Sequence, residues 1–256
     1  MLTQPLLDKL SLLRLSGLRQ GLEEQAQSPH FADLPFEDRL GLLIDREWIR
    51  RENARLSRGL RLARFHTAAC VEDLDLSPSR GIDRRLVLEL AQADWVRHHL
   101  NVLVLGPTGA GKTYLACALG QAACRFGMSV RYLRASRLLQ DFAHAHADGS
   151  YPKLLDTLGR TSLLVIDDWL RDPITPAQAR DLLEVLDDRY GRHSLLVVSQ
   201  VPVPQWHERI PDPTIADALL DRLVHNAHRL EFAPGAESQR KLRSPLRETT
   251  LREPAP

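Results

Sequence analysis

The chain has 256 residues, 43% of them hydrophobic, which is enough to bury a sizeable core in one large domain with a smaller appendage. Its formal net charge is +1, so no overall basic field favours nucleic acid, and a DNA-binding surface has to come from local clusters. The three cysteines fit neither a disulfide framework nor a zinc pattern, and we expect Cys117 and Cys124 to be reduced core residues. Without a secretion signal or an apolar run near the roughly 20 residues of a membrane span, the sequence predicts a cytoplasmic protein with no membrane partner.

Residues 1–69 are predicted to form a small helical domain. An amphipathic helix over 2–27 is indicated by leucines at three- and four-residue steps, Leu2, Leu6, Leu10 and Leu13. After a break at Ser28-Pro29, a longer and arginine-rich helix is expected from Phe36 to about Phe65. A loop-like stretch near residue 70 then marks the domain boundary.

Beyond residue 70, short apolar runs alternate with helical patterns. Strands are predicted at 102–105, 130–133, 163–166 and 195–198. Helices are predicted at 112–126, 136–147 and 176–190. This alternation indicates an α/β domain over 70–242, with a parallel sheet flanked by helices. The proline-containing, weakly apolar residues 243–256 are predicted to be a disordered tail.

A phosphate-binding loop is predicted between the first strand and the helix after it, where Leu103 to Thr113 read LVLGPTGAGKT. The glycines let backbone N–H groups surround an anion, Lys112 supplies a charge toward the β and γ phosphates, and Thr113 offers a hydroxyl to Mg²⁺. The alternative is an ordinary glycine-rich turn. We expect ATP and Mg²⁺ as cofactors, with nucleotide contacts from Gly106, Pro107, Thr108, Gly109, Ala110, Gly111, Lys112 and Thr113.

The strand predicted at 163–166 is followed by two acids, Asp167 and Asp168. Asp167 is expected to hold Mg²⁺ through its water shell, together with Thr113. Asp168 is expected to polarise the attacking water as a general base. The alternative is a strand that ends in two solvated carboxylates.

The strand predicted at 195–198 is followed by Ser199 and Gln200. Ligands of open α/β sheets bind in the crevice at the carboxyl ends of the central strands. Either side chain is therefore a candidate to touch the γ-phosphate or the water, unless the two residues merely end the strand.

Seven arginines and two glutamates lie between Arg46 and Phe65. At 100° per residue the arginines occupy one half of the helix, and the opposite half is predicted to pack through Leu42, Ile49, Leu56, Leu60 and Ala63. The arginine face is a candidate for duplex DNA with weak sequence preference, because guanidinium groups neutralise backbone phosphates. A solvated face without a ligand is the alternative. The candidate DNA-binding residues are Arg50, Arg51, Arg55, Arg58 and Arg61.

Taken together, the phosphate loop and the segments LLVIDDW, VSQVPVPQWH and DPTIADALLDRLVHNAHRLE carry a family resemblance that reaches to about Lys241. The chain resembles the IstB-like AAA+ ATPases, the transposition helper proteins of insertion sequences, which are related to the helicase loader DnaC and the replication initiator DnaA. The resemblance implies that Gly106–Thr113 is the Walker A motif, Asp167-Asp168 the Walker B motif, and Ser199-Gln200 the sensor 1 position.

The same resemblance implies that Arg222 is an arginine finger, which completes the ATP site of a neighbouring subunit. A surface ion pair with Asp217 or Asp221 is the alternative for this residue. The chain departs from the family pattern where Leu170-Arg171 replaces an expected Gly-Leu, and again before Arg240, whose place near the phosphates is therefore in doubt.

The function expected from the sequence is ATP-driven regulation of DNA transposition. The resemblance implies a homo-oligomer on duplex DNA that delivers target DNA to a transposase of the same element, or activates it. A helicase loader of the DnaC type is the nearest alternative. A small-molecule P-loop kinase and an inactive nucleotide-gated scaffold belong to other classes; the kinase fits the basic helix less well, and the scaffold fits the intact Lys112, Thr113, Asp167 and Asp168 less well.

Overall fold

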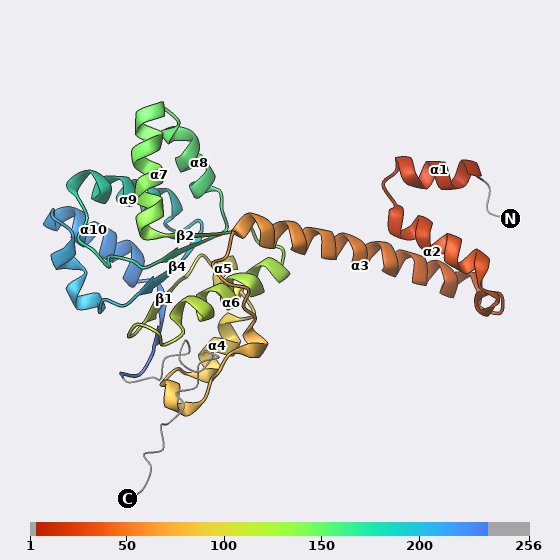
Figure 1. Cartoon of the computed structure of the whole chain (residues 1–256), viewed down its shortest axis with the longest axis horizontal. Helices are drawn as coiled ribbons and strands as arrows, with labels where there is room; N and C mark the ends of the chain where they lie inside the picture. The colour runs from red at the N-terminus through yellow and green to blue at the C-terminus, as the bar shows by residue number, and fades with distance from the viewer. Residues whose placement is uncertain (1–3, 235–256) are drawn as a thin grey trace, which may run out of the picture. The chain divides into compact units, whose positions relative to one another are not determined.

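The computed structural model of the chain describes residues 4–234 (Figure 1). The chain divides into two compact units, one ending at Arg58 and the other beginning at Gly59. This division falls inside a long helix, and the domain boundary near residue 70 stays a prediction. The predicted tail over 243–256 and Arg240 lie outside the described residues. Within residues 4–234, no helix combines the length and the apolar character that a membrane span requires.

The first unit is helical. It consists of α1 (Gln4–Leu12), α2 (Ser16–Gln27), the 3-10 turn η1 (Pro29–Phe31) and the greater part of α3 (Phe36–Ala63). The single helix predicted over 2–27 is wrong, because the chain breaks between α1 and α2, where Arg14 has a left-handed φ of +57°. Of the leucines that suggested one continuous face, Leu10 is buried, whereas Leu6 and Leu13 are exposed.

Helix α3 packs against α2 through Leu43 and Glu47, both of which are buried. Glycines on α2 permit the close approach: a Cβ at Gly17 would lie 2.9 Å from the Glu47 carboxylate, and a Cβ at Gly21 would lie 2.6 Å from the Leu43 side chain. Glu47 accepts hydrogen bonds from the backbone N–H groups of Gly17, at 2.7 Å, and Leu18, at 3.2 Å. A buried carboxylate thus satisfies the orphan donors at the start of α2.

The predicted apolar face of α3 is only partly correct. Ala63 is buried, and Leu56 and Leu60 are half-buried. Leu42 and Ile49, by contrast, are 48% and 58% exposed. The side of α3 that packs in the first unit is determined by the positions of the glycines on α2. The periodicity of the α3 sequence alone does not reveal those positions.

A five-stranded parallel sheet forms the centre of the second unit, in the order β2-β3-β4-β1-β5. Its strands are β1 (Asn101–Leu105), β2 (Val130–Arg134), β3 (Leu163–Asp167), β4 (Ser194–Ser199) and β5 (Ala227–Glu231). The four predicted strands are confirmed to within one residue at each end, and β5 was not predicted. The register pairs Leu105 with Ser199 and Arg134 with Asp167, so the carboxyl ends of four strands meet at one edge.

Helices cover both faces of this sheet (Figure 1). They are α4 (Arg84–Leu90), α5 (Asp94–Arg97), α6 (Lys112–Arg125), α7 (Ala135–Asp148), α8 (Tyr151–Gly159), α9 (Pro176–Arg189) and α10 (Pro213–Val224). Short 3-10 turns are η2 (Val71–Asp73), η3 (Pro78–Arg80), η4 (Val203–Gln205) and η5 (His207–Arg209). The predicted helices at 112–126, 136–147 and 176–190 are confirmed as α6, α7 and α9.

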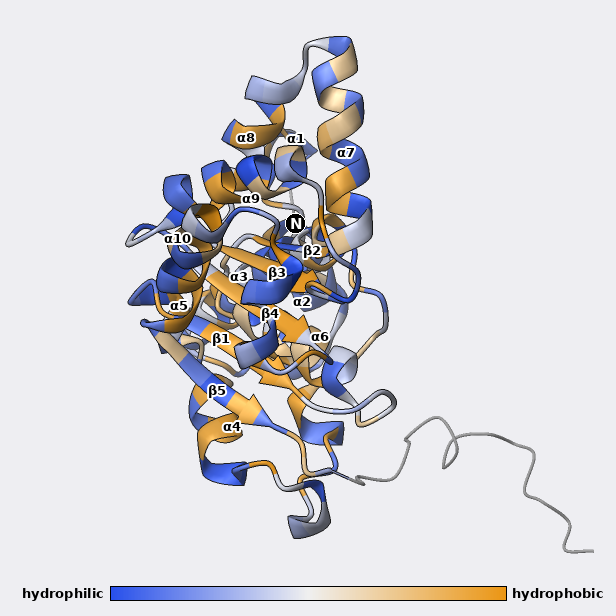
Figure 2. Cartoon of the chain, turned by 90° about the vertical axis from the view of Figure 1, so that its left-hand side faces the viewer, coloured by the Kyte–Doolittle hydropathy of each residue, from blue (hydrophilic) through white to orange (hydrophobic). Residues whose placement is uncertain are grey.

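The core of the second unit lies between the sheet and its helices. Alternate strand residues such as Leu103, Leu164 and Val197 belong to one cluster with α7, α8, α9 and α10. The intervening residues face the other side, where α6 packs across β1 to β4. Figure 2 shows the central strands coloured mostly as hydrophobic, as expected for a parallel sheet buried on both faces. Cys117 and Cys124 are buried as the sequence predicted, and Trp95, Trp169 and Trp206 are buried as well.

Arg189 at the end of α9 is fully buried, and no carboxylate within residues 4–234 forms an ion pair with it. Its guanidinium donates hydrogen bonds to the carbonyls of Leu158 at 2.5 Å, Thr161 at 2.8 Å and Ser194 at 2.5 Å. These carbonyls lie at the end of α8, before β3 and at the start of β4, so one side chain joins three chain segments. Burial lowers the pKa of Arg189.

We predict that Arg189→Met lowers the free energy of unfolding by about 3 kcal/mol, because methionine keeps much of the volume but leaves buried carbonyls without donors. Urea denaturation followed by circular dichroism measures this change. Arg192→Met, an exposed neighbour, is the matched control and is expected to change stability by less than about 0.5 kcal/mol. Equal effects of the two substitutions would contradict the role of Arg189.

Candidate nucleotide-binding site

The predicted phosphate loop connects β1 to α6. Gly111, at φ +103°, ends the loop, and α6 begins at Lys112. Gly106, at φ +140°, also needs the absence of a side chain, because a Cβ there would lie 2.7 Å from Cβ of Phe232. Phe232 is fixed in that position by its N–H, which donates to Leu105 O at 2.9 Å. The loop therefore has the backbone freedom and the helix N-terminus that an anion site requires.

Lys112 is buried at the start of α6, and its Nζ donates to Pro107 O at 2.8 Å across the loop. Burial lowers the pKa of Lys112, whereas the nearby carboxylates of Asp167 and Asp168 raise it. The two acids therefore stabilise the protonated amine of Lys112, whereas burial alone would favour the neutral amine. The structure brings Lys112 and both acids together as the sequence predicted.

Thr113 and Asp167 meet across the carboxyl edge of the sheet. Thr113 Oγ1 donates to Asp167 Oδ2 at 2.8 Å. The same carboxylate oxygen accepts a hydrogen bond from the Tyr132 hydroxyl at 2.6 Å, and Oδ1 accepts one from the N–H of Asp168 at 2.8 Å. Asp167 is only 3% exposed, so its charge is held by these donors rather than by bulk water.

Asp168 differs sharply from the acid beside it. Its backbone has a left-handed φ of +58°, and its side chain is 34% exposed. Arg171 Nη1 lies 3.9 Å from Asp168 Oδ2, at the limit of an ion pair. Asp168 thus presents a carboxylate toward solvent at the edge where Asp167 is enclosed.

Ser199 and Gln200 also reach this edge, but their side chains point to different partners. Ser199 is fully buried, and its hydroxyl donates to Trp169 O at 2.8 Å and accepts from the N–H of Val201 at 3.0 Å. Gln200 instead contacts the phosphate loop, where its Oε1 accepts a hydrogen bond from the Thr108 hydroxyl. The structure therefore brings Gln200 to the loop and leaves the Ser199 hydroxyl engaged with backbone.

Arg222 lies on α10, away from the phosphate loop of its own chain. The side chain of Asn101, at the start of β1, donates to Arg222 O at 3.0 Å, whereas the loop follows the end of that strand. Five strand residues separate the two ends by about 15 Å, more than an arginine side chain spans. Arg222 forms an ion pair with Asp187 of α9 rather than with Asp217 or Asp221. Its own Nη1 donates to Ala218 O at 2.9 Å.

The candidate DNA-binding arginines of α3 divide into two groups. Arg50 and Arg51 each bind the Glu47 carboxylate at 2.7 Å, and Arg55 binds Glu52 at 2.7 Å. The hydrogen bond from Arg50 is the main reason why the pKa of Glu47 falls to about 2. Within residues 4–234, Arg58 and Arg61 form no such ion pair. Their guanidinium charges are therefore the most available ones on this helix.

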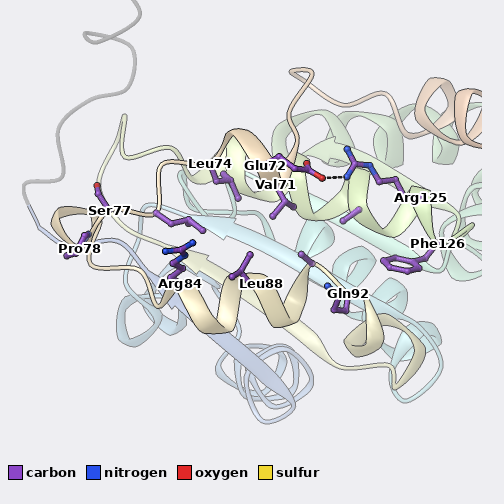
Figure 3. Close-up of a pocket in the computed structure, with 13 residues that line it drawn as sticks. Val71, Glu72, Leu74, Ser77, Pro78, Arg84, Leu88, Gln92, Arg125 and Phe126 are labelled. Atoms are coloured by element: carbon purple, nitrogen blue, oxygen red, sulfur yellow. Dashed lines mark hydrogen bonds and ion pairs between the residues drawn. The ribbon is translucent and has the colours of Figure 1, made fainter.

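Two hollows lie along α6, and sequence reasoning missed both. A small one beside the phosphate loop is lined mainly by apolar side chains, among them Leu74, Ile82, Tyr114 and Phe232. A larger cavity of about 720 Å³ lies between α4 and the end of α6, where Arg125 bridges to Glu72 at 2.5 Å (Figure 3). The segment of η2 and η3 that separates them reads as a loop in the sequence and carries no motif.

Comparison with known proteins agrees with this geometry. The family model described as IstB-like ATP binding protein matches residues 8–245. The chain belongs to this family. The family assignment confirms the predicted resemblance to the IstB-like proteins and makes the chain an ATP-binding protein.

Relatives of the IstB-like family match along most of their length. A Sinorhizobium fredii protein named as an insertion sequence ATP-binding protein (y4pL) is 46% identical over 91% of this chain and 95% of its own. The Mycobacterium tuberculosis protein Rv3427c, named as an ATP-binding protein in an insertion sequence, is 34% identical over 86% of this chain and 88% of its own.

Among solved structures, the fold is similar to that of the DnaC helicase loader, with a TM-score of 0.54 at 17% identity over 66% of this chain and 99% of that chain. It is also similar to AMPPCP-bound DnaA from Aquifex aeolicus, with a TM-score of 0.56 at 17% identity over 70% and 54% of the two chains. These similarities confirm the predicted α/β AAA+ architecture.

We predict that Lys112→Ala abolishes ATP binding by this IstB-like protein, because the loop loses its one buried cation facing the phosphates. Asp168→Asn is expected to bind ATP normally and to hydrolyse it at least about 100-fold more slowly, as for loss of a general base. Fluorescent nucleotide titration and phosphate release measure the two steps. Lys153→Ala, on the exposed surface of α8, is the control. Wild-type turnover by Asp168→Asn would remove this residue from the mechanism.

Proposed function

We propose that this chain is an ATP-hydrolysing helper of DNA transposition that oligomerises on duplex DNA and delivers target DNA to, or activates, a transposase. The observation that carries the proposal is the meeting of Lys112, Thr113, Asp167 and Asp168 at one edge of the sheet in a chain of the IstB-like family. The names of its relatives as insertion sequence proteins support transposition as the process served.

The residues present fit a magnesium ion. The Thr113 hydroxyl and the Asp167 carboxylate are 2.8 Å apart and offer the hard oxygen ligands that Mg²⁺ prefers. When bound with ATP, Mg²⁺ neutralises charge on the β and γ phosphates. In the proposal, Lys112 contacts these phosphates. Gln200, which accepts a hydrogen bond from Thr108, helps to orient the phosphate loop. Asp168 accepts a proton from the attacking water, and Ser199 positions the turn that carries Asp168 through its bond to Trp169 O.

The small apolar hollow beside the phosphate loop is the proposed binding pocket for the nucleotide base. Leu74 and Ile82 come from the segment before β1, whereas Tyr114 follows the loop on α6. Ligand pockets are lined mostly by hydrophobic and aromatic side chains, and this lining lies next to the phosphate loop. The base and the phosphates would thereby fix the nucleotide at both ends.

Oligomerisation is proposed because Arg222 cannot serve its own phosphate loop. Arg222 lies near the amino end of β1 and the loop follows its carboxyl end, yet the side chain is 28% exposed and faces a surface hollow of α10. In a head-to-tail assembly, Arg222 would leave Asp187 and reach the γ-phosphate at a neighbour's Lys112. A cationic finger in trans raises hydrolysis by about 10³–10⁵-fold, so hydrolysis would be coupled to assembly.

A helicase loader is the second candidate function, favoured by the fold similarity to DnaC over 99% of that chain. The two functions share the ATP site and differ in the partner. Pull-down with a transposase of the same element, against the replicative helicase of the same cell, separates them.

The trans arrangement is tested by mixing Arg222→Ala with Lys112→Ala. Each variant alone is expected to hydrolyse little ATP, whereas random mixing pairs an intact loop with an intact finger at about one interface in four. Activity should therefore recover on mixing and depend on protein concentration. Arg180→Ala, an exposed arginine on α9, is the control and should retain turnover. Absence of recovery, together with full hydrolysis by monomeric wild-type protein, would overturn the proposal.

Binding to DNA is tested on Arg58 and Arg61 of α3. We predict that the double variant Arg58→Ala/Arg61→Ala binds duplex DNA of any sequence more weakly and lowers the log–log salt slope by about 1.8, because each lost phosphate contact removes about 0.9. The matched double variant Arg19→Ala/Arg160→Ala removes the same charge from arginines paired with Glu23 and Asp156. Equal slopes for the two variants would place the DNA site elsewhere.

A further inference from the structure

Tyr132 on β2 forms the shortest hydrogen bond to Asp167, although no sequence motif includes it. Its hydroxyl donates to Asp167 Oδ2 at 2.6 Å, and the side chain is only 6% exposed. The register of the sheet sets this contact, because Tyr132 pairs with Val165, two residues before Asp167 on the neighbouring strand.

The outer face of the Tyr132 ring is covered by His66. The two rings are 6.4 Å apart between centroids and inclined by 14°, and Arg134 Nη2 lies 3.2 Å from His66 Nε2. Phe65, the residue before His66, packs on α6, where a Cβ at Gly120 would lie 2.6 Å from its ring. The segment after α3 thus limits the movement of the tyrosine ring.

Counting donors shows what this bond does. An ionised carboxylate has about four lone-pair sites, and Asp167 uses three of them for Thr113, Tyr132 and the N–H of Asp168. Thr113 is itself a proposed ligand, so its oxygen lone pairs would face the metal while its O–H can still donate to Asp167. Tyr132 is the side-chain donor to Asp167 that is not itself a proposed metal ligand, and the Asp168 N–H holds the other carboxylate oxygen.

We propose that Tyr132 is a positioning residue that orients the Asp167 carboxylate for the magnesium of bound ATP. The inference rests on the proposed ATP and Mg²⁺ site and deepens it. Removal of a group that hydrogen-bonds to a metal ligand commonly lowers the metal affinity by about 10–100-fold. Tyr132 acts only on the metal-dependent part of nucleotide binding, because it donates to Asp167 and not to the loop.

The test uses the full chain with Tyr132→Phe, which removes the hydroxyl and keeps the ring. The Mg²⁺ concentration for half-maximal binding of a fluorescent ATP analogue is expected to rise about tenfold. Binding in EDTA should stay at the wild-type level, and turnover at saturating Mg²⁺ should recover most of its wild-type value. Tyr151→Phe is the matched control, because that hydroxyl donates to Glu184 at 2.8 Å on the α8–α9 surface.

The outcomes separate this inference from the function on which it rests. An unchanged Mg²⁺ midpoint in folded Tyr132→Phe, with normal Mg²⁺ dependence in the wild type, would overturn the role of Tyr132 alone. Equal losses in EDTA and in Mg²⁺ would also overturn it, since they indicate a general effect on folding. Wild-type protein that binds ATP without any Mg²⁺ dependence would instead contradict the proposed metal site.

Discussion

The hydrogen bond between Thr113 and Asp167 depends on one constraint, which is that every strand of the sheet runs in the same direction. Parallel pairing places the carboxyl ends of β1, β3 and β4 at one edge. The phosphate loop, the two acids and Gln200 all follow strand ends, so they converge although about 90 residues of sequence separate the first from the last. The five-stranded sheet is buried between helices on both faces, so core packing fixes the positions of the strand ends. The site residues that follow these ends are thereby held in place.

The features that could be predicted are those with a local physical signal. The three central strands, β1, β3 and β4, are nearly continuous apolar runs because both of their faces are buried, and their ends therefore read clearly. Edge strand β5 has the sequence AHRLE, in which Leu230 is buried and its neighbours are exposed or half-buried, so it lacks such a run. The break between α1 and α2 at Arg14 has neither glycine nor proline to mark it. Local propensity cannot show a turn that tertiary packing imposes.

Which side chains contact one another was harder to predict than which segments form helices or strands. The arginines of α3 were recognised, but the packed stripe was misplaced because Gly17 and Gly21 admit Leu43 and Glu47 on a different face. That placement brings Glu47 beside Arg50 and Arg51 and ties part of the basic face to α2. Likewise, no spacing rule joins Tyr132 to Asp167, because a cross-strand contact depends on the register between two strands.

The turn after β3 shows how two adjacent acids acquire different environments. Asp168 and Leu170 both have left-handed backbones, at φ +58° and +48°, which cost of order 1–2 kcal/mol per residue without glycine. Leu170 stands where the resemblance leads us to expect glycine, and its side chain, which is only 3% exposed, offsets part of this cost by packing in the core. Trp169 lies between them. Its backbone N–H donates to Val198 O at 2.9 Å, and its ring makes an edge contact with Trp206. Because the tryptophan is fixed, the strained residues on either side cannot relax. The turn therefore holds Asp167 inside, against Thr113 and Tyr132, and directs Asp168 outward, where a carboxylate can meet water.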